Sequence, residues 1–298
     1  MAKKFEKING ILPTEYFPEG VGLVLEGGGM RGYYSAGVFE AFMDKNIMFK
    51  YIAGVSAGAA NALTYVACQK LRNRQIAEHF AGKSNYVGLR NLILHGSMFN
   101  RKMIFDKIPN KYVPFDWETF NKCETRFLTG TMDCNTGKTV WFEKNDIDKE
   151  LKATIASCAV PIISPIVEFK GYKLLDGGIS CPIPIEKSID DGNKFHVIVL
   201  TQNKGYIKKP FSQEKIARKM YKKYPEMVQS MIERHILYNK QIELCEKLEA
   251  EGKAIIIRPL EPLEVERTTK DAKALLKLYD EGHKEATDKI KDIFAMVK

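Results

Sequence analysis

The sequence predicts an α/β fold in which helices flank a central, mainly parallel sheet. Strand-like and helix-like segments alternate near the start of the chain, and the turns after the first two strands are rich in glycine. The alternating segments are an apolar strand over Val21 to Glu26, a helix over Tyr33 to Lys45, a strand over Phe49 to Ala53 and an Ala-rich helix over Ala57 to Leu71. Alternation at this spacing implies right-handed crossovers between parallel strands.

The rest of the chain continues the sheet and then becomes helical. Residues 72–118 are less regular. The later expected elements are strands over 127–133 and 138–143 around an Asn-Thr-Gly turn, a short helix over 149–157, a hairpin of 166–169 and 172–175, a strand over 195–202, and long charged helices over 212–251 and 269–298 around a strand at 254–258. We expect a main domain over residues 20–203 and a helical C-terminal extension, residues 204–298, packed on the same domain.

Composition limits the kind of protein. The chain has 298 residues, of which 45% are hydrophobic and 28% charged, enough to bury one large core. Its apolar runs are too short and too often interrupted to span a membrane, and the first seven residues lack the apolar run of a signal peptide. The six cysteines form no C-x-x-C pair and the five histidines no H-x-x-x-H pair. We therefore expect a cytoplasmic protein with free thiols and no metal site.

The net charge of +9 is concentrated in one segment. Between Lys208 and Lys223 there are seven basic residues and one acid, and apolar residues recur there near helical spacing. Such a helix either contacts an anionic membrane surface or is a solvated helix that packs its apolar face on the protein's own core. We expect no nucleic-acid partner.

The segment Gly54-Val55-Ser56-Ala57-Gly58 matches G-x-S-x-G, the spacing of a nucleophile elbow. A serine in an elbow lies on a sharp strand-to-helix turn, so its hydroxyl projects from the backbone. Gly54 and Gly58 suit this turn because a Cβ on either side would crowd it. Ser56 is therefore a candidate nucleophile, and a purely structural glycine turn is the alternative.

The loop Gly27-Gly28-Gly29-Met30-Arg31-Gly32 follows the first strand and precedes the first helix. Its first, third and sixth residues satisfy G-x-G-x-x-G, the dinucleotide-binding fingerprint. That fingerprint requires an acid at the end of the second strand, where this chain has Ser56, so we expect no cofactor. The other interpretations are a structural tight turn and an oxyanion hole, in which Gly28 and Gly29 are the expected N–H donors.

An elbow serine needs a base. His196, His235 and His283 lie in strand-like or helix-like patterns rather than in a loop after a strand. Asp176 is the better candidate, because it ends an apolar strand and is followed by Gly177-Gly178, which let the chain turn away and leave the carboxylate exposed. A solvated Asp-Gly turn is the alternative.

In this order, the Gly-Gly-Gly-x-Arg-Gly loop, the elbow and the Asp-Gly-Gly motif resemble the patatin-like phospholipase family. The segment Ala156-Ser157-Cys158-Ala159-Val160-Pro161 is also similar to the family's sequence ahead of the aspartate, and the resemblance covers about residues 20–200. The chain has Asp-Gly-Gly where many members have Asp-Gly-Ala. The resemblance implies a patatin-like fold whose catalytic domain is the main domain.

The resemblance also implies roles for individual residues. Ser56 is expected to be the nucleophile and Asp176 the general base of a Ser–Asp dyad without histidine. The expected oxyanion loop consists of Gly27, Gly28 and Gly29. Arg31 matches a basic position that lies near the lipid phosphate in related cytosolic phospholipases.

The function implied is that of a lipid acyl hydrolase, which releases fatty acids from phospholipid or other acyl-lipid esters without metal or cofactor. Two alternatives stay open: a carboxylesterase or thioesterase for soluble acyl substrates, and a lipid-binding regulatory protein without turnover. The apolar stretch Tyr86 to Leu94, with Met98 and Phe99, is expected to line an acyl pocket, to form a lid or to pack in the core.

Overall fold

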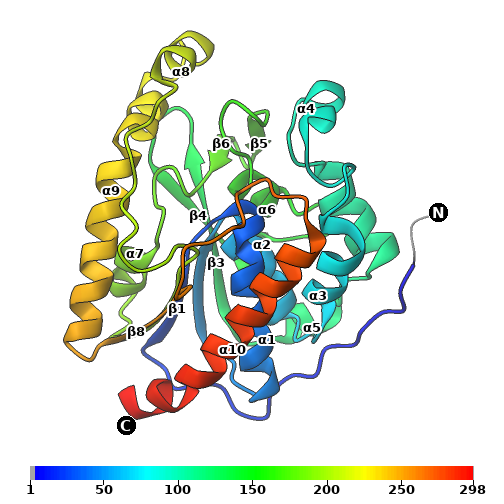
Figure 1. The fold of residues 1–298 in the computed structure, drawn as a ribbon, viewed down its shortest axis with the longest axis vertical. Helices are drawn as coiled ribbons and strands as arrows, with labels where there is room; N and C mark the ends of the chain where they lie inside the picture. The colour runs from blue at the N-terminus through cyan, green and yellow to red at the C-terminus, as the bar shows by residue number, and fades with distance from the viewer. Residues whose placement is uncertain (1–3, 298) are drawn as a thin grey trace.

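The computed structural model describes residues 4–297, which form one eight-stranded sheet covered by helices on both faces (Figure 1). The strands are β1 (Val21–Leu25), β2 (Tyr51–Val55), β3 (Arg126–Asp133), β4 (Thr139–Glu143), β5 (Val167–Phe169), β6 (Tyr172–Asp176), β7 (Phe195–Val199) and β8 (Ala254–Ile257). The α-helices are α1 (Tyr33–Asp44), α2 (Ala57–Val66), α3 (Arg72–Ile76), α4 (Leu89–His95), α5 (Trp117–Lys122), α6 (Lys152–Ser157), α7 (Ile185–Asp190), α8 (Glu214–Met220), α9 (Pro225–Ala250) and α10 (Ala272–Met296).

The sheet confirms the predicted fold class. Its strand order is β5-β6-β3-β2-β1-β7-β8, and β4 pairs with β3 outside this path. The pairs β1–β2, β1–β7, β2–β3 and β7–β8 are parallel, whereas the pairs that involve β4, β5 and β6 are antiparallel. Because β8 pairs with β7, a strand from the C-terminal extension belongs to the same sheet.

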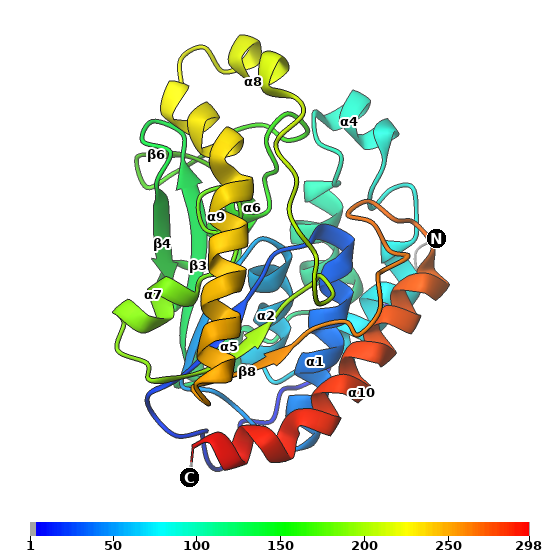
Figure 2. The ribbon, with the colours of Figure 1, turned by 60° about the vertical axis from the view of Figure 1, so that its left-hand side comes forward.

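Alternate side chains of the parallel strands enter different hydrophobic clusters, since successive residues of a strand point to opposite faces. Leu23 and Leu25 of β1 belong to the cluster that includes apolar residues of α1, α2 and α10. Val24 belongs to a second cluster, with Ile198 of β7 and Tyr238 of α9. Figure 2 shows α9 on one side of the sheet and α1 with α10 on the other.

Helix α10 lies directly against α1, and glycines allow the close approach. A Cβ added to Gly37 of α1 would lie 1.9 Å from the Tyr279 carbonyl oxygen, and one added to Gly282 of α10 would lie 2.1 Å from the Tyr34 carbonyl oxygen. The Tyr279 hydroxyl also donates to Glu40 Oε2 at 2.9 Å. The last helix is therefore part of the core.

Two segments differ from the sequence-based expectation. Residues 72–118 contain α3, α4, the start of α5 and two π-helical segments, Ala77–Ala81 and Met103–Tyr112. The helix expected to continue to Leu71 ends at Val66, because Cys68 and Leu71 adopt positive φ angles of 51° and 62° that no α-helix accommodates.

The helix expected over residues 212–251 is divided into α8 and α9, and the basic segment ends before α9 begins. Pro225 begins α9 at a position where its missing N–H is harmless, and the chain between α8 and α9 is non-helical. As a result Met227 and Met231 are buried in the core, whereas Ile216 and Met220 of α8 are exposed. Among residues 4–297, none of the helices combines the length and apolarity needed to cross a bilayer.

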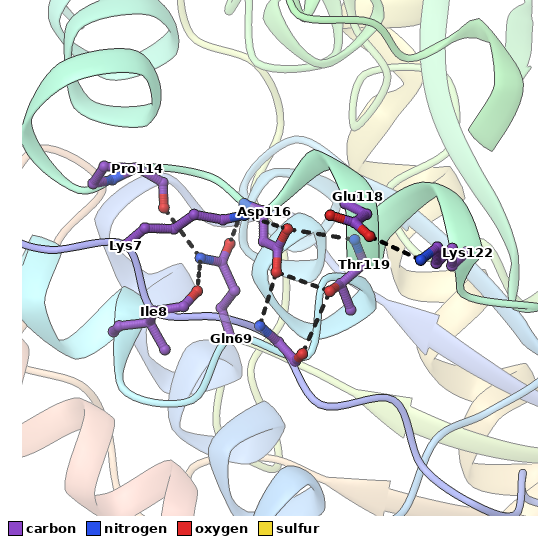
Figure 3. Close-up of polar contacts among 9 residues, drawn as sticks. Lys7, Ile8, Gln69, Pro114, Asp116, Glu118, Thr119 and Lys122 are labelled. Atoms are coloured by element: carbon purple, nitrogen blue, oxygen red, sulfur yellow. Dashed lines mark hydrogen bonds and ion pairs between the residues drawn. The ribbon is translucent and has the colours of Figure 1, made fainter.

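The N-terminal arm, residues 4–16, is held by the buried carboxylate of Asp116 (Figure 3). Asp116 accepts a hydrogen bond from the Gly10 N–H at 2.9 Å and forms an ion pair with Lys7 at 2.8 Å. Gln69 donates to the carbonyl oxygens of Ile8 and Pro114, at 2.7 and 3.1 Å. These contacts fasten the arm beside α5, which Asp116 caps.

Candidate active site

Strand β3 places the two predicted site residues next to each other. Val55 of β2 pairs with Gly130, and Asp176 of β6 pairs with the next residue, Thr131. Strand β4 pairs with both Gly130 and Thr131, so it occupies the opposite edge of β3. Because β2 and β6 therefore meet end to end along one edge, Ser56, which follows Val55, lies beside Asp176.

Ser56 has the geometry of an elbow. Its φ and ψ angles are 53° and −131°, a conformation that a non-glycine residue rarely adopts and that often marks functional sites. A Cβ on Gly58 would lie 2.5 Å from the Glu26 carbonyl oxygen, so only glycine fits where α2 meets the end of β1. The Ser56 hydroxyl donates to Asp176 Oδ2 at 2.7 Å, and both residues are buried.

Asp176 is buried, so the prediction of an exposed carboxylate is wrong. The two glycines that follow it pack inward: a Cβ on Gly177 would lie 2.1 Å from the Gly130 carbonyl oxygen, and the Gly178 N–H donates to Asp176 Oδ1 at 2.7 Å. Burial raises the pKa of Asp176 above its ordinary value. The hydrogen bonds from Ser56 and Gly178 and the charges of Arg234 and Arg267 oppose this rise.

The glycine loop touches the elbow. A Cβ on Gly27 would lie 2.8 Å from the Ser56 Cβ, and Gly29 has a φ of 59°, which glycine adopts without strain. Within residues 4–297, the backbone N–H groups of Gly28 and Gly29 donate no hydrogen bond. Two unused donors beside the serine suit a developing oxyanion. Gly32, the last motif glycine, packs against α2, where a Cβ would lie 2.7 Å from the Ala57 Cβ.

An apolar pocket opens beside Ser56. It is lined on one side by Met30, Tyr33 and Ala60, and on the other by Tyr86, Phe99 and further residues of the 101–160 region. A second hollow continues it toward the core and shares six lining residues: Tyr33, Ala60, Asn61, Tyr86, Ile104 and Phe105. An elongated apolar cavity that starts at the serine has the shape and chemistry of an acyl-chain site.

Three residues near the site were not predicted. Ser157, at the end of α6, accepts a hydrogen bond from the Ser56 N–H at 2.7 Å and donates to the Gly130 carbonyl oxygen at 2.6 Å. The Arg234 Nε on α9 donates to the Gly178 carbonyl oxygen, and the Arg267 carbonyl oxygen accepts from the Met30 N–H at 3.0 Å. For Ser157, the only signal was its position in the segment that resembles the family. The sequence around Arg234 and Arg267 contains no motif that predicts a role for them in the site.

The remaining predicted residues lie outside the pocket beside Ser56. The Arg31 side chain is close to Glu26 and Arg267 and lines neither of the hollows beside the serine. His196 is buried in β7 and contacts Ser188 Oγ at 3.1 Å, and His283 contacts Asp44 on the outer side of α1. Within the described residues, no histidine side chain is hydrogen-bonded to Ser56 or Asp176.

The fold and site define a class of α/β proteins with an elbow serine, a buried aspartate and a glycine loop at one edge of the sheet. A family model described as patatin-like phospholipase matches residues 23–188, more than half of the chain. The chain belongs to the patatin-like phospholipase family. A second model, a domain of unknown function (DUF6363), matches residues 224–298.

Curated relatives and a solved structure are also similar to this chain. "Uncharacterized protein YjjU" of Escherichia coli K12 is 25% identical over 190 residues, which are 62% of this chain and 52% of that protein. "Uncharacterized NTE family protein Rv1063c" of Mycobacterium tuberculosis is 28% identical over 165 residues, 55% of this chain and 44% of that protein. The chain thus spans about half of the length of these relatives. VipD from Legionella pneumophila aligns with a TM-score of 0.39 and 11% identity over 98% of this chain and 75% of that chain.

Proposed function

We propose that this protein is a serine acyl hydrolase that acts on lipid esters with a Ser56–Asp176 dyad. The Ser56 oxygen attacks the acyl carbonyl carbon while Asp176 takes the hydroxyl proton. The Gly28 and Gly29 N–H groups stabilise the oxyanion, the alcohol leaves with the proton from Asp176, and an acyl-serine ester remains. Water, deprotonated by Asp176, then attacks this ester, and Asp176 returns the proton to the Ser56 oxygen as the fatty acid is released.

The observation that carries the proposal is the buried 2.7 Å hydrogen bond from Ser56 Oγ to Asp176 Oδ2 on a strained elbow. A carboxylate in direct contact with the nucleophile needs no imidazole between them. Burial raises the pKa of Asp176 and so makes it a stronger base than a solvated aspartate. The apolar pocket that begins at Ser56 supports an acyl substrate.

A chromogenic short-chain ester and a fluorophosphonate probe test the proposal together. We expect the wild type to hydrolyse the ester and to be labelled, Ser56→Ala to lose both activities, and Asp176→Asn to lose at least 10³-fold in turnover, roughly the range of losses seen for triad members. Replacement of His196, His235 or His283 by alanine, one at a time, is the control and should leave most activity.

Other results would favour the alternatives. Full activity of folded Ser56→Ala would overturn the serine mechanism, and loss of activity in one histidine variant would replace the dyad by a triad. A folded, unlabelled wild type without turnover would indicate a lipid-binding regulatory protein. Turnover of soluble esters or thioesters but not of vesicle lipids would indicate an esterase or thioesterase.

We also propose a cytoplasmic location with peripheral contact to anionic membranes. Figures 1 and 2 both place α4 and α8 at the same end of the molecule, above the segment that precedes α10. Helix α4 exposes Leu89, Ile93 and Leu94, with 82% of Ile93 accessible. Helix α8 exposes Ile216 and Met220 among basic side chains. Exposed apolar side chains on α4, and exposed apolar side chains beside lysine and arginine on α8, suit the interface of an anionic bilayer.

A further inference from the structure

Three basic side chains from the C-terminal part of the chain converge on one pocket. Lys208 precedes α8, Arg234 lies on α9, and Arg267 lies in the segment between β8 and α10. All three line a hollow whose other walls include residues 160–163, Ile179 after the Asp-Gly-Gly motif, and residues 209–213. No Asp or Glu among the described residues lines it.

This pocket adjoins the proposed active site. The Arg234 Nε donates to the carbonyl oxygen of Gly178, two residues after Asp176. Arg267 lies over the oxyanion loop: its carbonyl oxygen holds the Met30 N–H, and a Cβ on Gly29 would lie 2.7 Å from that oxygen. Figure 1 shows the orange segment that contains Arg267 crossing the top of α1 before it descends into α10. Val160 lines both this pocket and the apolar one.

Glu26 and Asp176 act on Arg234 through space, but the three cations of the pocket have no direct carboxylate partner among the described residues. None of these three side chains forms an ion pair with a carboxylate of residues 4–297. Burial, followed by repulsion from Arg234 and Arg267, lowers the pKa of Lys208 to about 7. The nearby carboxylates are already engaged: Glu26 accepts from the Thr201 N–H at 2.6 Å, and Asp176 accepts from Ser56 and Gly178. Lys208 and Arg234 are half-buried and Arg267 is exposed. Gathering these cations in this way is unfavourable unless an anion binds.

We propose that Lys208, Arg234 and Arg267 form a phosphate-binding subsite that holds the alcohol part of the ester substrate. The acyl chain then occupies the apolar pocket on one side of Ser56, and a phosphate-bearing alcohol occupies the basic pocket on the other. Two guanidinium groups and an ammonium match the charge and the several acceptor oxygens of a phosphate. This assigns a role to the C-terminal segment and rests on the proposed function.

The test compares two soluble esters with the same hexanoyl chain, one of glycerol and one of glycerol 3-phosphate. We expect the wild type to have the higher kcat/KM on the phosphate ester. The Lys208→Gln/Arg267→Gln double variant should lose at least tenfold more kcat/KM on the phosphate ester than on the neutral one, as should Arg234→Gln. Arg267→Lys keeps the charge and should retain most of the preference. Lys240→Gln, an exposed lysine of α9 outside the pocket, is the matched control.

Binding separates this inference from the proposed function. Glycerol 3-phosphate should bind to Ser56→Ala, and addition of Lys208→Gln/Arg267→Gln should weaken this binding at least tenfold, whether or not the wild type hydrolyses esters. Equal substrate preference in the wild type and the double variant would overturn the subsite. If inorganic phosphate binds equally well and the phosphate ester has no kinetic advantage, the pocket holds a free anion and the assignment to the leaving group is wrong.

Discussion

The Ser157 hydroxyl connects the elbow to strand β3, because it accepts from the Ser56 N–H and donates to the Gly130 carbonyl oxygen. Ser157→Ala would leave both buried backbone groups without a partner, at about 1–3 kcal/mol for each group. We expect the free energy of unfolding in urea to fall by about 2 kcal/mol and ester turnover to fall with it. Ser164→Ala, which removes a buried hydroxyl that is hydrogen-bonded to Ser97 Oγ, is the control and should change turnover little. Undiminished turnover in folded Ser157→Ala would show that the elbow holds its shape without this link.

The charge of Arg234 affects the pKa of Asp176, the proposed base. Its guanidinium favours the carboxylate form of Asp176 and so opposes the rise in the Asp176 pKa that burial causes. The proposed base acts as a carboxylate, so activity is present above this pKa and is lost as pH falls through it. Arg234→Gln should therefore move the acid limb of the kcat/KM profile on a neutral ester to higher pH. An unchanged limb, matching that of Lys240→Gln, would show that Arg234 does not act on the base.

Single residues were predictable where a local motif carries the chemistry. Ser56 and Asp176 follow from the elbow and from Asp-Gly-Gly, and the structure places them in hydrogen-bond contact. Ser157, Arg234 and Arg267 depend on contacts between segments far apart in the chain. Their roles rest on the register of β3 and on the path of the segment before α10, and no short motif encodes either.

Secondary-structure elements were predictable where hydrophobic periodicity was regular. The strands around the site and the last helix lie within a few residues of their expected bounds, whereas the helix expected over 212–251 is divided into α8 and α9. The errors arise where the backbone departs from regular geometry. Leu71 and Leu151, which precede α3 and α6, have φ angles of 62° and 54°. A left-handed conformation at a residue other than glycine is seldom predictable from the sequence.

Helix α2 controls the length of the apolar cavity, because Ala60 lines both of its hollows. Ala60→Phe should fill the connection between the hollows and leave the space beside Ser56 open. We expect kcat/KM for a hexadecanoyl ester to fall at least tenfold relative to that for a butanoyl ester of the same alcohol. Lys240→Phe, an exposed substitution on α9 outside both hollows, is the control. Equal loss on both esters would mean that long chains do not enter this cavity.

The N-terminal arm should stabilise the fold through Asp116 (Figure 3). Burial alone would raise the pKa of Asp116, but the ion pair with Lys7 and hydrogen bonds from Gly10 and Thr119 lower it to about 2. A depressed pKa means that this stabilisation is present above the unfolded value of about 3.9 and is lost as pH falls toward 2. Asp116→Asn should lower the free energy of unfolding at pH 7 by about 1–2 kcal/mol.

The pH dependence provides the check on this prediction. The difference between wild type and Asp116→Asn should shrink between about pH 4 and pH 2, measured by urea unfolding. Glu118→Gln is the matched control, because Glu118 forms an exposed ion pair with Lys122 on the same helix. A difference that stays constant down to pH 2 would show that shape, rather than charge, holds the arm.

At the scale of the whole molecule, the class of fold was predictable and the way in which its parts combine was not. Alternating strands and helices indicate a parallel sheet, but they do not reveal that β2 and β6 share one edge of β3. Nor do they reveal that β8 extends the sheet beside β7, or that Arg267 lies against the glycine loop. The site therefore combines the segment matched by the patatin-like model with the segment matched by the model of unknown function. The division into residues 20–203 and 204–298 stays a prediction.

The positions of α4 and α8 make it possible to test the proposed membrane contact as two independent contributions, one electrostatic and one apolar. Helix α8 and the residues directly after it expose Lys219, Lys222 and Lys223. The attraction of each lysine to a nearby anionic surface contributes about 1 kcal/mol to binding. Helix α4 exposes apolar side chains, and the free energy of burying them in a membrane does not depend on salt screening. Charge reversal of the three lysines to Glu should therefore weaken cosedimentation with anionic vesicles at low salt. It should have little effect at 1 M salt, where the Debye length is about 3 Å.

The apolar contribution should behave in the opposite way. Ile93→Ser/Leu94→Ser should weaken vesicle binding at both salt concentrations, whereas hydrolysis of a soluble ester should hardly change because neither residue lines the cavity beside Ser56. Two controls match these variants: Lys240, Lys284 and Lys291 changed together to Glu, and Ile189→Ser on α7. If the controls weaken binding as much as the variants at the α4 and α8 end, net charge and general surface apolarity govern binding. Lipid would then reach Ser56 from another face of the molecule.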